Sequence, residues 1–137
     1  MPITSQNFLD SAKKCSSLGD EADYRNTVSR AYYSMYHEAL SSLLCIPNYS
    51  SNHHSNLISY LRTKSENSKE PFDTFKMRSL AYRLDQQRQA RHEADYDISS
   101  VEISKDIAES AIAAADLFFD DWSSLKLTSA DQNKANT

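Results

Sequence analysis

Hydrophobic residues recur every three to four positions along most of the chain, the spacing that places them on one face of an α-helix. This pattern predicts helices over residues 5–18, 20–44, 54–64 and 71–94, and a last helix that opens at Ser99. The two strongest stripes, in the second and last of these helices, are Val28, Ala31, Tyr32, Met35, Ala39 and Leu43, and Ile103, Ile107, Ala111, Ala115, Phe118 and Trp122. Stripes of this kind pack against a core, so we expect a bundle in which each long helix buries one face.

Residues that favour helix ends lie between these stripes. Thr4 or Ser5 can cap the first helix, and Gly19 suits the left-handed position that ends it. Pro71 suits the first turn of the fourth helix. A Ser-x-x-Glu capping box opens the last helix at Ser99.

Polar stretches mark the segments that we expect outside the core. Residues 63–70 are polar and uncapped, which favours a mobile surface loop. From Leu125 onward the composition changes to Ser, Asp, Gln, Asn, Lys and Thr, which is typical of a disordered chain. We therefore predict one domain over residues 1–124 and a disordered C-terminal tail over residues 125–137.

The composition narrows the fold class. One Gly and three Pro in 137 residues are too few for the turns that a β-sheet protein of this size needs. The sequence thus predicts an all-α bundle of four to five helices. Cys15 and Cys45 lie in helical patterns, which favours buried thiols in a reducing compartment over a disulfide. Because neither a signal-peptide pattern nor a membrane-length apolar run is present, we expect a cytoplasmic protein without a membrane partner.

Positive charge is concentrated in one stretch of an otherwise acidic chain. Between Lys76 and His92 there are five basic residues and one acidic residue, whereas the whole chain carries a net charge of -4. Arg83 and Arg91 lie eight residues apart with Gln87 between them, so we expect these three on one helical face. Arg88 and His92 form a second pair four residues apart. This contrast predicts a local anion site rather than a general polyanion-binding surface.

Two segments resemble a known family. Residues 24–39, YRNTVSRAYYSMYHEA, are similar to the long second helix of the HEPN domain (higher eukaryotes and prokaryotes nucleotide-binding), and residues 91–96, RHEADY, resemble its RxxADY motif. His54 also resembles a histidine that often follows the first long loop of that family. The resemblance implies an all-α bundle that commonly dimerises. Many members are metal-independent ribonucleases without a cofactor, often toxins or defence effectors whose antitoxin partner is a nucleotidyltransferase.

The nuclease motif of that family is an Arg, four to six further residues and then a His. In this chain Tyr96 occupies the position where a His would follow Arg91. Three residues separate Arg88 from His92, one fewer than the motif requires. The spacing therefore departs from the family pattern, while the residue types are present.

Metal-independent RNA cleavage needs a proton acceptor for the 2′-hydroxyl, a cation beside the phosphate and a proton donor for the leaving oxygen. His92 can exchange protons near neutral pH, and Arg88 and Arg91 can bind phosphate oxygens. These three are the candidate catalytic residues, with solvated surface side chains as the alternative. The adjacent His53 and His54 have no further ligand at metal-binding spacing, so no metal site is expected.

A second group of residues is expected to contact substrate: Arg30, Tyr33, Arg83, Asp95 and Tyr96. A structural role is the competing interpretation for several of them. Arg91 and Asp95 are four residues apart and can form an ion pair within the helix. Arg30 is a further candidate partner of Asp95, and the tyrosines can belong to the core.

Three functions are compatible with these observations. The first is a HEPN-type metal-independent endoribonuclease, a toxin or phage-defence effector that acts as a homodimer. The alternative is a non-catalytic HEPN module that binds a nucleotide, RNA or a nucleotidyltransferase partner. A purely structural helical dimer is the third.

Overall fold

The computed structural model describes residues 3–135, with side chains described for residues 3–129. Within that range the chain forms six helices and no strand, which confirms the all-α prediction. The helices are α1 (Ser5–Leu18), α2 (Glu21–Ser42), α3 (His53–Arg62), α4 (Lys64–Asn67), α5 (Thr74–Tyr96) and α6 (Lys105–Ala135). The sequence predicted four to five, and the additional helix is the single turn α4.

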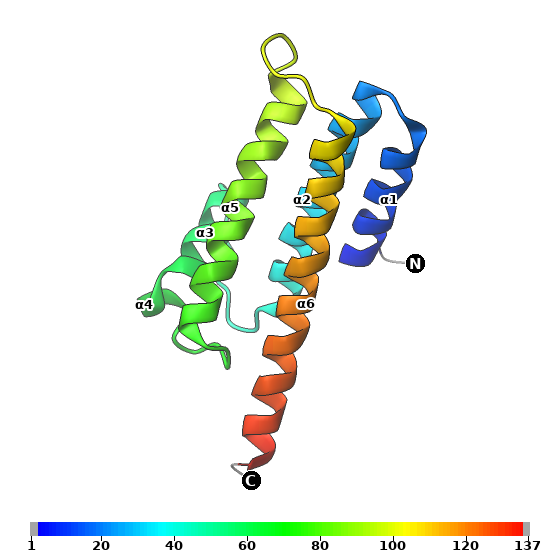
Figure 1. The fold of residues 1–137 in the computed structure, drawn as a ribbon. Helices are drawn as coiled ribbons and strands as arrows, with labels where there is room; N and C mark the ends of the chain where they lie inside the picture. Colours follow the sequence, from blue (N-terminus) through cyan, green and yellow to red (C-terminus); the bar gives the residue numbers. More distant parts are fainter. Residues whose placement is uncertain (1–2, 136–137) are drawn as a thin grey trace.

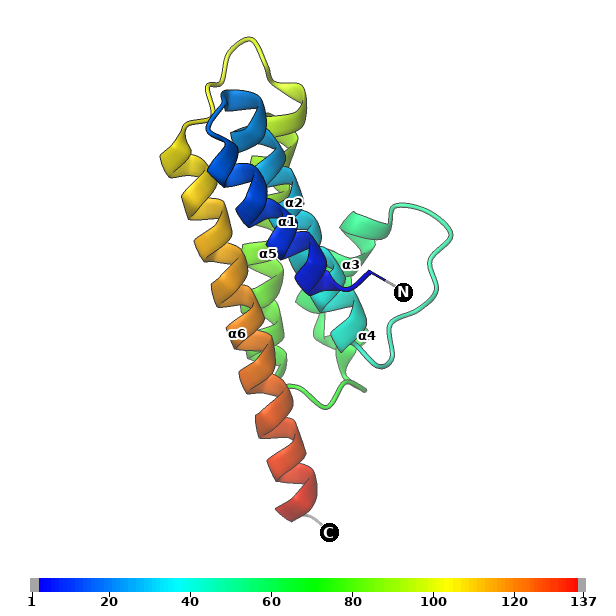
Figure 2. The same cartoon turned by 90° about the vertical axis from the view of Figure 1, so that its right-hand side faces the viewer.

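Helix α2 is the centre of the bundle, because it contacts α1, α5 and α6. Figure 1 shows α2 and α6 running in the same direction and α5 running opposite to them, with α6 extending beyond the other helices at its C-terminal end. Helix α3 lies against α5, and the short helix α4 lies against α3. The view in Figure 2 shows α1 packed along α2 and the long α2–α3 loop projecting from the bundle.

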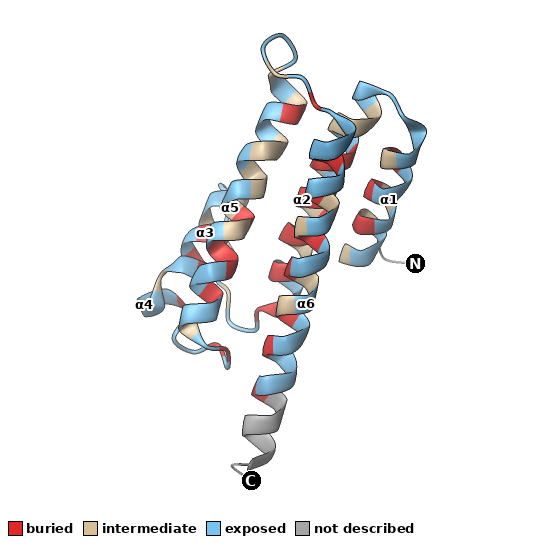
Figure 3. Cartoon of the chain, in the orientation of Figure 1, coloured by how far each residue is buried: buried red, intermediate tan, exposed pale blue. Residues whose placement is uncertain are grey.

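The core is formed by the apolar faces of these helices, as the buried positions in Figure 3 show. Its largest fully buried side chains include Trp122, Tyr32, Tyr60 and Phe118. The ring of Phe72 meets that of Trp122 edge-on, with centroids 5.4 Å apart. This contact anchors the segment before α5 on the surface of α6.

The predicted ends of α1 are confirmed. Thr4 accepts a hydrogen bond from the backbone N–H of Asn7 through its side-chain oxygen. Gly19 ends the helix with a φ angle of 94°, a left-handed conformation that residues with a Cβ rarely adopt.

The predicted starts of α5 and α6 are wrong. Helix α5 begins at Thr74, where Asp73 accepts from the N–H of Phe75 at 2.8 Å, so Pro71 lies in the preceding loop. Helix α6 begins at Lys105, where Ser104 Oγ accepts from the N–H of Ile107 at 3.3 Å. The expected capping box at Ser99 does not form, because residues 98–100 form a turn closed by the carboxylate of Asp97.

The segment 63–70, predicted to be a mobile surface loop, is instead tied into the fold. Asn67 is 1% exposed, and its side-chain N–H₂ donates to two carbonyl groups at the end of α3. Glu70 is 6% exposed. Its carboxylate accepts three hydrogen bonds, from the backbone N–H groups of Leu44 and Cys45 and from the hydroxyl of Tyr60. Asn67 and Glu70 thus form hydrogen bonds with backbone groups of the fold. A polar composition alone does not distinguish such residues from those of a solvent-exposed loop.

The structure is helical beyond residue 124, where we predicted the domain to end. Helix α6 continues to Ala135, and Leu125 and Ser129 are buried at 4% and 8% exposure. The expectation of a disordered tail from residue 125 is therefore wrong for the described part, because Leu125 extends the buried stripe of α6. Residues 136–137 lie outside the described residues.

Both cysteines are free, Cys15 buried and Cys45 exposed in the loop after α2. The expectation of a buried thiol is therefore wrong for Cys45, because α2 ends at Ser42. Among the described residues, no helix combines the length and the apolar character that a membrane span requires.

Candidate functional site

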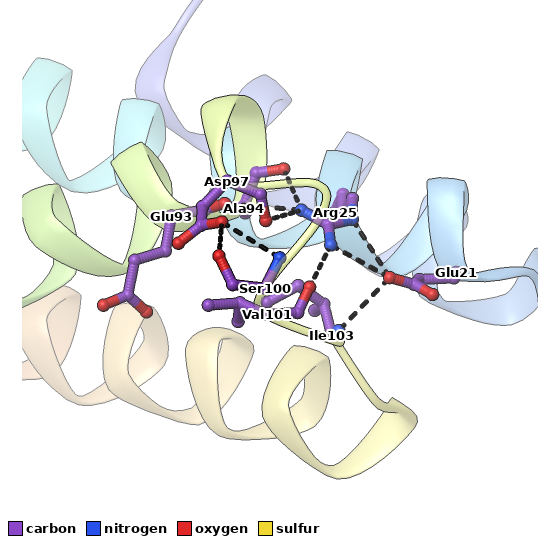
Figure 4. A network of polar contacts seen from close by, with 8 residues as sticks. All are labelled: Glu21, Arg25, Glu93, Ala94, Asp97, Ser100, Val101 and Ile103. Carbon is purple, nitrogen blue, oxygen red and sulfur yellow. Dashed lines mark hydrogen bonds and ion pairs between the residues drawn. The ribbon is translucent and has the colours of Figure 1, made fainter.

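The last turn of α5, which carries most of the candidate residues, is held in place by Arg25 of α2. Figure 4 shows its guanidinium among the backbone carbonyls that follow α5. Nη1 donates to the carbonyls of Ala94 at 2.9 Å and Asp97 at 3.2 Å, and Nη2 donates to that of Val101. Helix ends leave carbonyls without partners, and one planar cation satisfies several of them here. Glu21 Oε1 lies 3.0 Å from Nη2 and completes the network.

Arg91 makes its contacts within the protein. Its Nη2 donates to the hydroxyl of Tyr33 at 2.7 Å, and its Nε lies 2.9 Å from a carboxylate oxygen of Asp95. The predicted ion pair is thus confirmed, although the buried Nε–H does not point at the carboxylate and forms no hydrogen bond. The guanidinium also lies over two rings, 5.1 Å from the centroid of Tyr33 and 5.7 Å from that of Tyr96. These contacts fix the side chain and leave it little freedom to reach a ligand.

The expected pairing of Arg30 with Asp95 is wrong. Asp95 instead accepts from the hydroxyl of Ser29 at 3.2 Å, and Arg30 donates to Ser11 on α1. Neighbouring residues on a helix point about 100° apart, so Ser29 faces α5 while Arg30 faces α1. Arg30 is thereby placed away from the other candidate residues.

Arg83 is likewise separated from Arg91, and it pairs with Asp121 on α6. Over eight residues a helix turns about 80° beyond two full turns, so the side chains of Arg83 and Arg91 do not lie on one face as we expected. Arg83 lines a separate hollow between α5 and α6.

Arg88 is a partly buried cation without a partner among the described side chains. Its side chain is half-buried, and among the described side chains it makes no ion pair or hydrogen bond. It lines an open hollow on α5 together with Asp85, Gln89, Arg91, His92 and Glu93. The three residues predicted as catalytic therefore meet at one hollow, with His92 exposed and its ring 4.9 Å from that of Tyr96.

A histidine on α3, His54, packs against the tyrosines of α2. His54 Nδ1 lies 2.7 Å from the hydroxyl oxygen of Tyr32, and its ring stacks on Tyr36 with centroids 4.1 Å apart. Burial lowers the pKa of His54, and the positive charges of Arg88 and Arg91 lower it further. Burial raises the pKa of Tyr32, and Arg88 partly offsets that rise.

The model of the HEPN domain family matches residues 4–125 of the chain. The chain belongs to the HEPN domain family. No curated protein and no solved structure matched it. Membership identifies the protein as a nucleotide- or RNA-related module and agrees with the all-α fold.

Within the described part of this HEPN domain, no group of three or more His, Cys, Asp or Glu side chains is arranged to hold a metal ion. The side chains that line the α5 hollow supply guanidinium, imidazole, carboxamide and carboxylate groups.

Sequence reasoning missed two residues of this HEPN site. Arg25 was not singled out, because its role depends on where the end of α5 comes to lie. His54 was considered chiefly as a metal ligand and set aside, although its resemblance to a family histidine was the available signal.

Proposed function

We propose that the protein is a HEPN-type metal-independent endoribonuclease that acts as a homodimer. The observation that carries this proposal is Arg88, a half-buried guanidinium without an ion-pair partner among the described side chains, which lines one hollow with His92. A partly buried cation is costly unless an anion accompanies it, and a phosphate is the natural anion for a planar guanidinium. RNA supplies a phosphate next to a reactive hydroxyl.

The reaction uses the groups at the α5 hollow. The imidazole of His92 takes the proton of the 2′-hydroxyl as the bond from O2′ to phosphorus forms. Arg88 stabilises the negative charge that develops on the phosphate oxygens. The bond from phosphorus to O5′ then breaks, and O5′ takes a proton from a second imidazolium. The products are a 2′,3′-cyclic phosphate and a 5′-hydroxyl.

A homodimer supplies that second imidazolium, because one α5 helix presents a single exposed histidine at this hollow. The role of Arg91 in this scheme is to hold α5 and α2 together and to add positive charge near the phosphate. Of the remaining residues predicted to contact substrate, Tyr33, Asp95 and Tyr96 act through Arg91, with which each of them is in contact.

We further propose a cytoplasmic toxin or phage-defence effector, paired with a nucleotidyltransferase-type antitoxin, in line with the resemblance described above. Expression of the wild-type protein without that partner should then slow cell growth. Expression of Arg88→Ala should not.

The nuclease proposal is tested by incubating the purified protein with single-stranded RNA in EDTA. Removal of an acid–base group typically lowers a rate by about 10²–10⁴-fold, so His92→Ala and Arg88→Ala should lose most cleavage. Arg78→Ala is the matched control, since Arg78 is exposed on the same helix and lies outside the hollow. Intact RNA with the wild-type protein, or full activity of His92→Ala, would contradict the proposal.

One observation favours a non-catalytic HEPN module instead. Arg91 is committed to Tyr33 and Asp95, and Asp85 and Glu93 add negative charge around the hollow. In that case the hollow binds a nucleotide, RNA or a partner protein without reaction. RNA affinity that falls steeply with salt, with no cleavage at any salt concentration, identifies this alternative.

A further inference from the structure

Two tyrosines of α5 lie exposed on either side of the hollow that Arg88 and His92 line. Tyr82 precedes the hollow and Tyr96 follows it, and each residue is 63% exposed. A single exposed aromatic residue needs no explanation in a soluble protein. Two of them on the same face as a candidate site are a different observation, because they can contact the same ligand as that site.

Helix geometry places both tyrosines on the face that carries the hollow. Tyr82, Gln89 and Tyr96 follow one another at intervals of seven residues, so each lies within about 20° of the previous one around the helix. Gln89 is one of the residues that line the hollow. Seven residues advance a helix by about 10 Å, so the hollow lies about midway between the two tyrosines.

Tyr96 borders the hollow through direct contacts with two of the residues that line it. Its ring centroid lies 4.9 Å from that of His92, with the two planes inclined by 54°. The guanidinium of Arg91 lies 5.7 Å from the same ring centroid. Since Tyr96 remains largely exposed in spite of these contacts, a ligand in the hollow can reach its ring.

Tyr82 is similarly open on the other side of the hollow. Its hydroxyl oxygen accepts a hydrogen bond from Nε2 of Gln86 at 3.2 Å, a contact at the edge of the ring that leaves the ring faces unused. Asp85, which lines the hollow one turn later, lies 3.6 Å from the guanidinium of Arg62. This ion pair weakens the one negative charge between Lys76 and His92.

Charge and ring chemistry together identify the ligand that fits this face. The stretch from Lys76 to His92 carries five basic residues and one acidic residue in a chain with a net charge of -4. An anionic ligand with flat aromatic groups on both sides of a phosphate matches a cationic hollow between two exposed rings. Single-stranded RNA has this form, whereas the bases of a duplex stack on one another and do not offer their faces.

We infer that Tyr82 and Tyr96 are stacking sites for two unpaired bases of single-stranded RNA, one on each side of the phosphate at the hollow. This inference rests on the proposed function for the identity of the ligand. The 14 residues between the two tyrosines span about 21 Å, or about six nucleotides at the 3.4 Å spacing of a stacked strand. In addition to its contact with Arg91, Tyr96 thus contacts the substrate directly.

The test measures binding separately from cleavage and stacking separately from charge. The first probe is a fluorescently labelled, fully 2′-O-methylated RNA of about six nucleotides, which lacks the reactive hydroxyl and is long enough to reach both tyrosines. The second probe has the same backbone with abasic sugars, so it keeps the phosphates and lacks the bases. The wild-type protein should bind the first probe about tenfold or more tightly than the second, because base stacking adds to each contact.

Leucine and phenylalanine variants separate the role of the ring from that of apolar bulk. Tyr82→Leu and Tyr96→Leu should each bind the first probe about fivefold or more weakly than the wild type, the loss expected for one stacked base. Both should bind the abasic probe as the wild type does. Tyr82→Phe and Tyr96→Phe keep the ring and should bind the first probe within about twofold of the wild type.

Phe75→Leu is the matched control. Phe75 is an exposed aromatic residue of the same helix, about 10 Å beyond Tyr82 on the side away from the hollow, so the short probe should bind this variant normally. Thermal unfolding of each variant verifies that it is folded. The abasic probe provides a further check for Tyr96, because a variant that disturbs Arg91 would weaken both probes alike.

The outcomes separate this inference from the proposed function. Unchanged binding by the leucine variants, an equal loss with the abasic probe, or an equal loss in Phe75→Leu would each overturn the inference. Cleavage of RNA in EDTA that depends on Arg88 and His92 but not on either tyrosine would overturn it as well, while leaving the nuclease intact. Binding that depends on both rings, with cleavable RNA left whole in EDTA, would support the stacking sites and overturn the nuclease.

Discussion

Replacing Arg25 by alanine removes the contact that joins the start of α2 to the end of α5 and to the segment between α5 and α6. The side chain is 12% exposed, and four of its acceptors are backbone carbonyls, of which those of Ala94, Asp97 and Val101 make the three shortest contacts. A hydrogen bond from a charged donor contributes about 1.5–3 kcal/mol net, with values toward the lower end where water can reach the freed acceptor. We set aside the ion pair with Glu21, because its carboxylate is 46% exposed and such pairs contribute little.

Taking about 1–1.5 kcal/mol for each of the three carbonyls gives a loss of roughly 3–4 kcal/mol in the free energy of unfolding. For a domain of this size that corresponds to a fall of roughly 10 °C in the unfolding temperature. Urea unfolding followed by circular dichroism measures the free energy. Arg25→Lys should recover less than half of the loss, because an ammonium group cannot span three carbonyls as a planar fork does.

Arg62→Ala is the matched control. Arg62 is 53% exposed, and its nitrogen lies 3.6 Å from Asp85, so its removal should cost less than about 0.5 kcal/mol. If Arg25→Ala also cost less than about 1 kcal/mol, water would be an adequate partner for those carbonyls, and the reasoning from the network in Figure 4 would be refuted.

Three further predictions concern stability and protonation. Leu125→Ala should lower the free energy of unfolding by about 2–4 kcal/mol, whereas Leu127→Ala, at a position 67% exposed, should change it little; equal effects would contradict the packing of α6 beyond residue 124. Glu70→Gln should cost about 2 kcal/mol in the same measurement, because the amide presents a donor group to three donors. The pKa of His54, followed by nuclear magnetic resonance, should lie below the ordinary value of 6.5. The folded state then binds this proton less readily than the unfolded state, so the contribution of His54 to stability should be complete above pH 6.5 and decrease as the pH falls below it. A titration midpoint of His54 above pH 6.5 would contradict this prediction.

The helices were predictable because their apolar stripes determine both their existence and their buried faces. The apolar spacing of α6 extends to Leu125, which follows Trp122 at helical spacing. The polar residues on either side of Leu125 nevertheless favour a prediction of disorder. The local sequence does not determine whether Ser99 or Ser104 caps α6, because the answer depends on the turn that Asp97 closes.

The site was predictable in its residue types and only partly in its geometry. The pair of Arg91 and Asp95 follows from their spacing alone and was confirmed. The distinct roles of Arg25 and Arg30 depend on which neighbour each faces, α5 in one case and α1 in the other. The contacts of His54 with Tyr32 and Tyr36 join α3 to α2, and no local pattern specifies a contact between these two segments.

The last turn of a helix usually frays, and its amide hydrogens exchange quickly with solvent. In α5 this turn is secured twice, by Arg25 at its carbonyls and by Arg91 between Tyr33 and Asp95. Opening this turn therefore requires the release of α2 as well, so its amides should exchange only in the global unfolding event. The hollow that carries Arg88 and His92 thus lies on the part of α5 that local fluctuations reach last, which favours a site whose geometry is set before any ligand arrives.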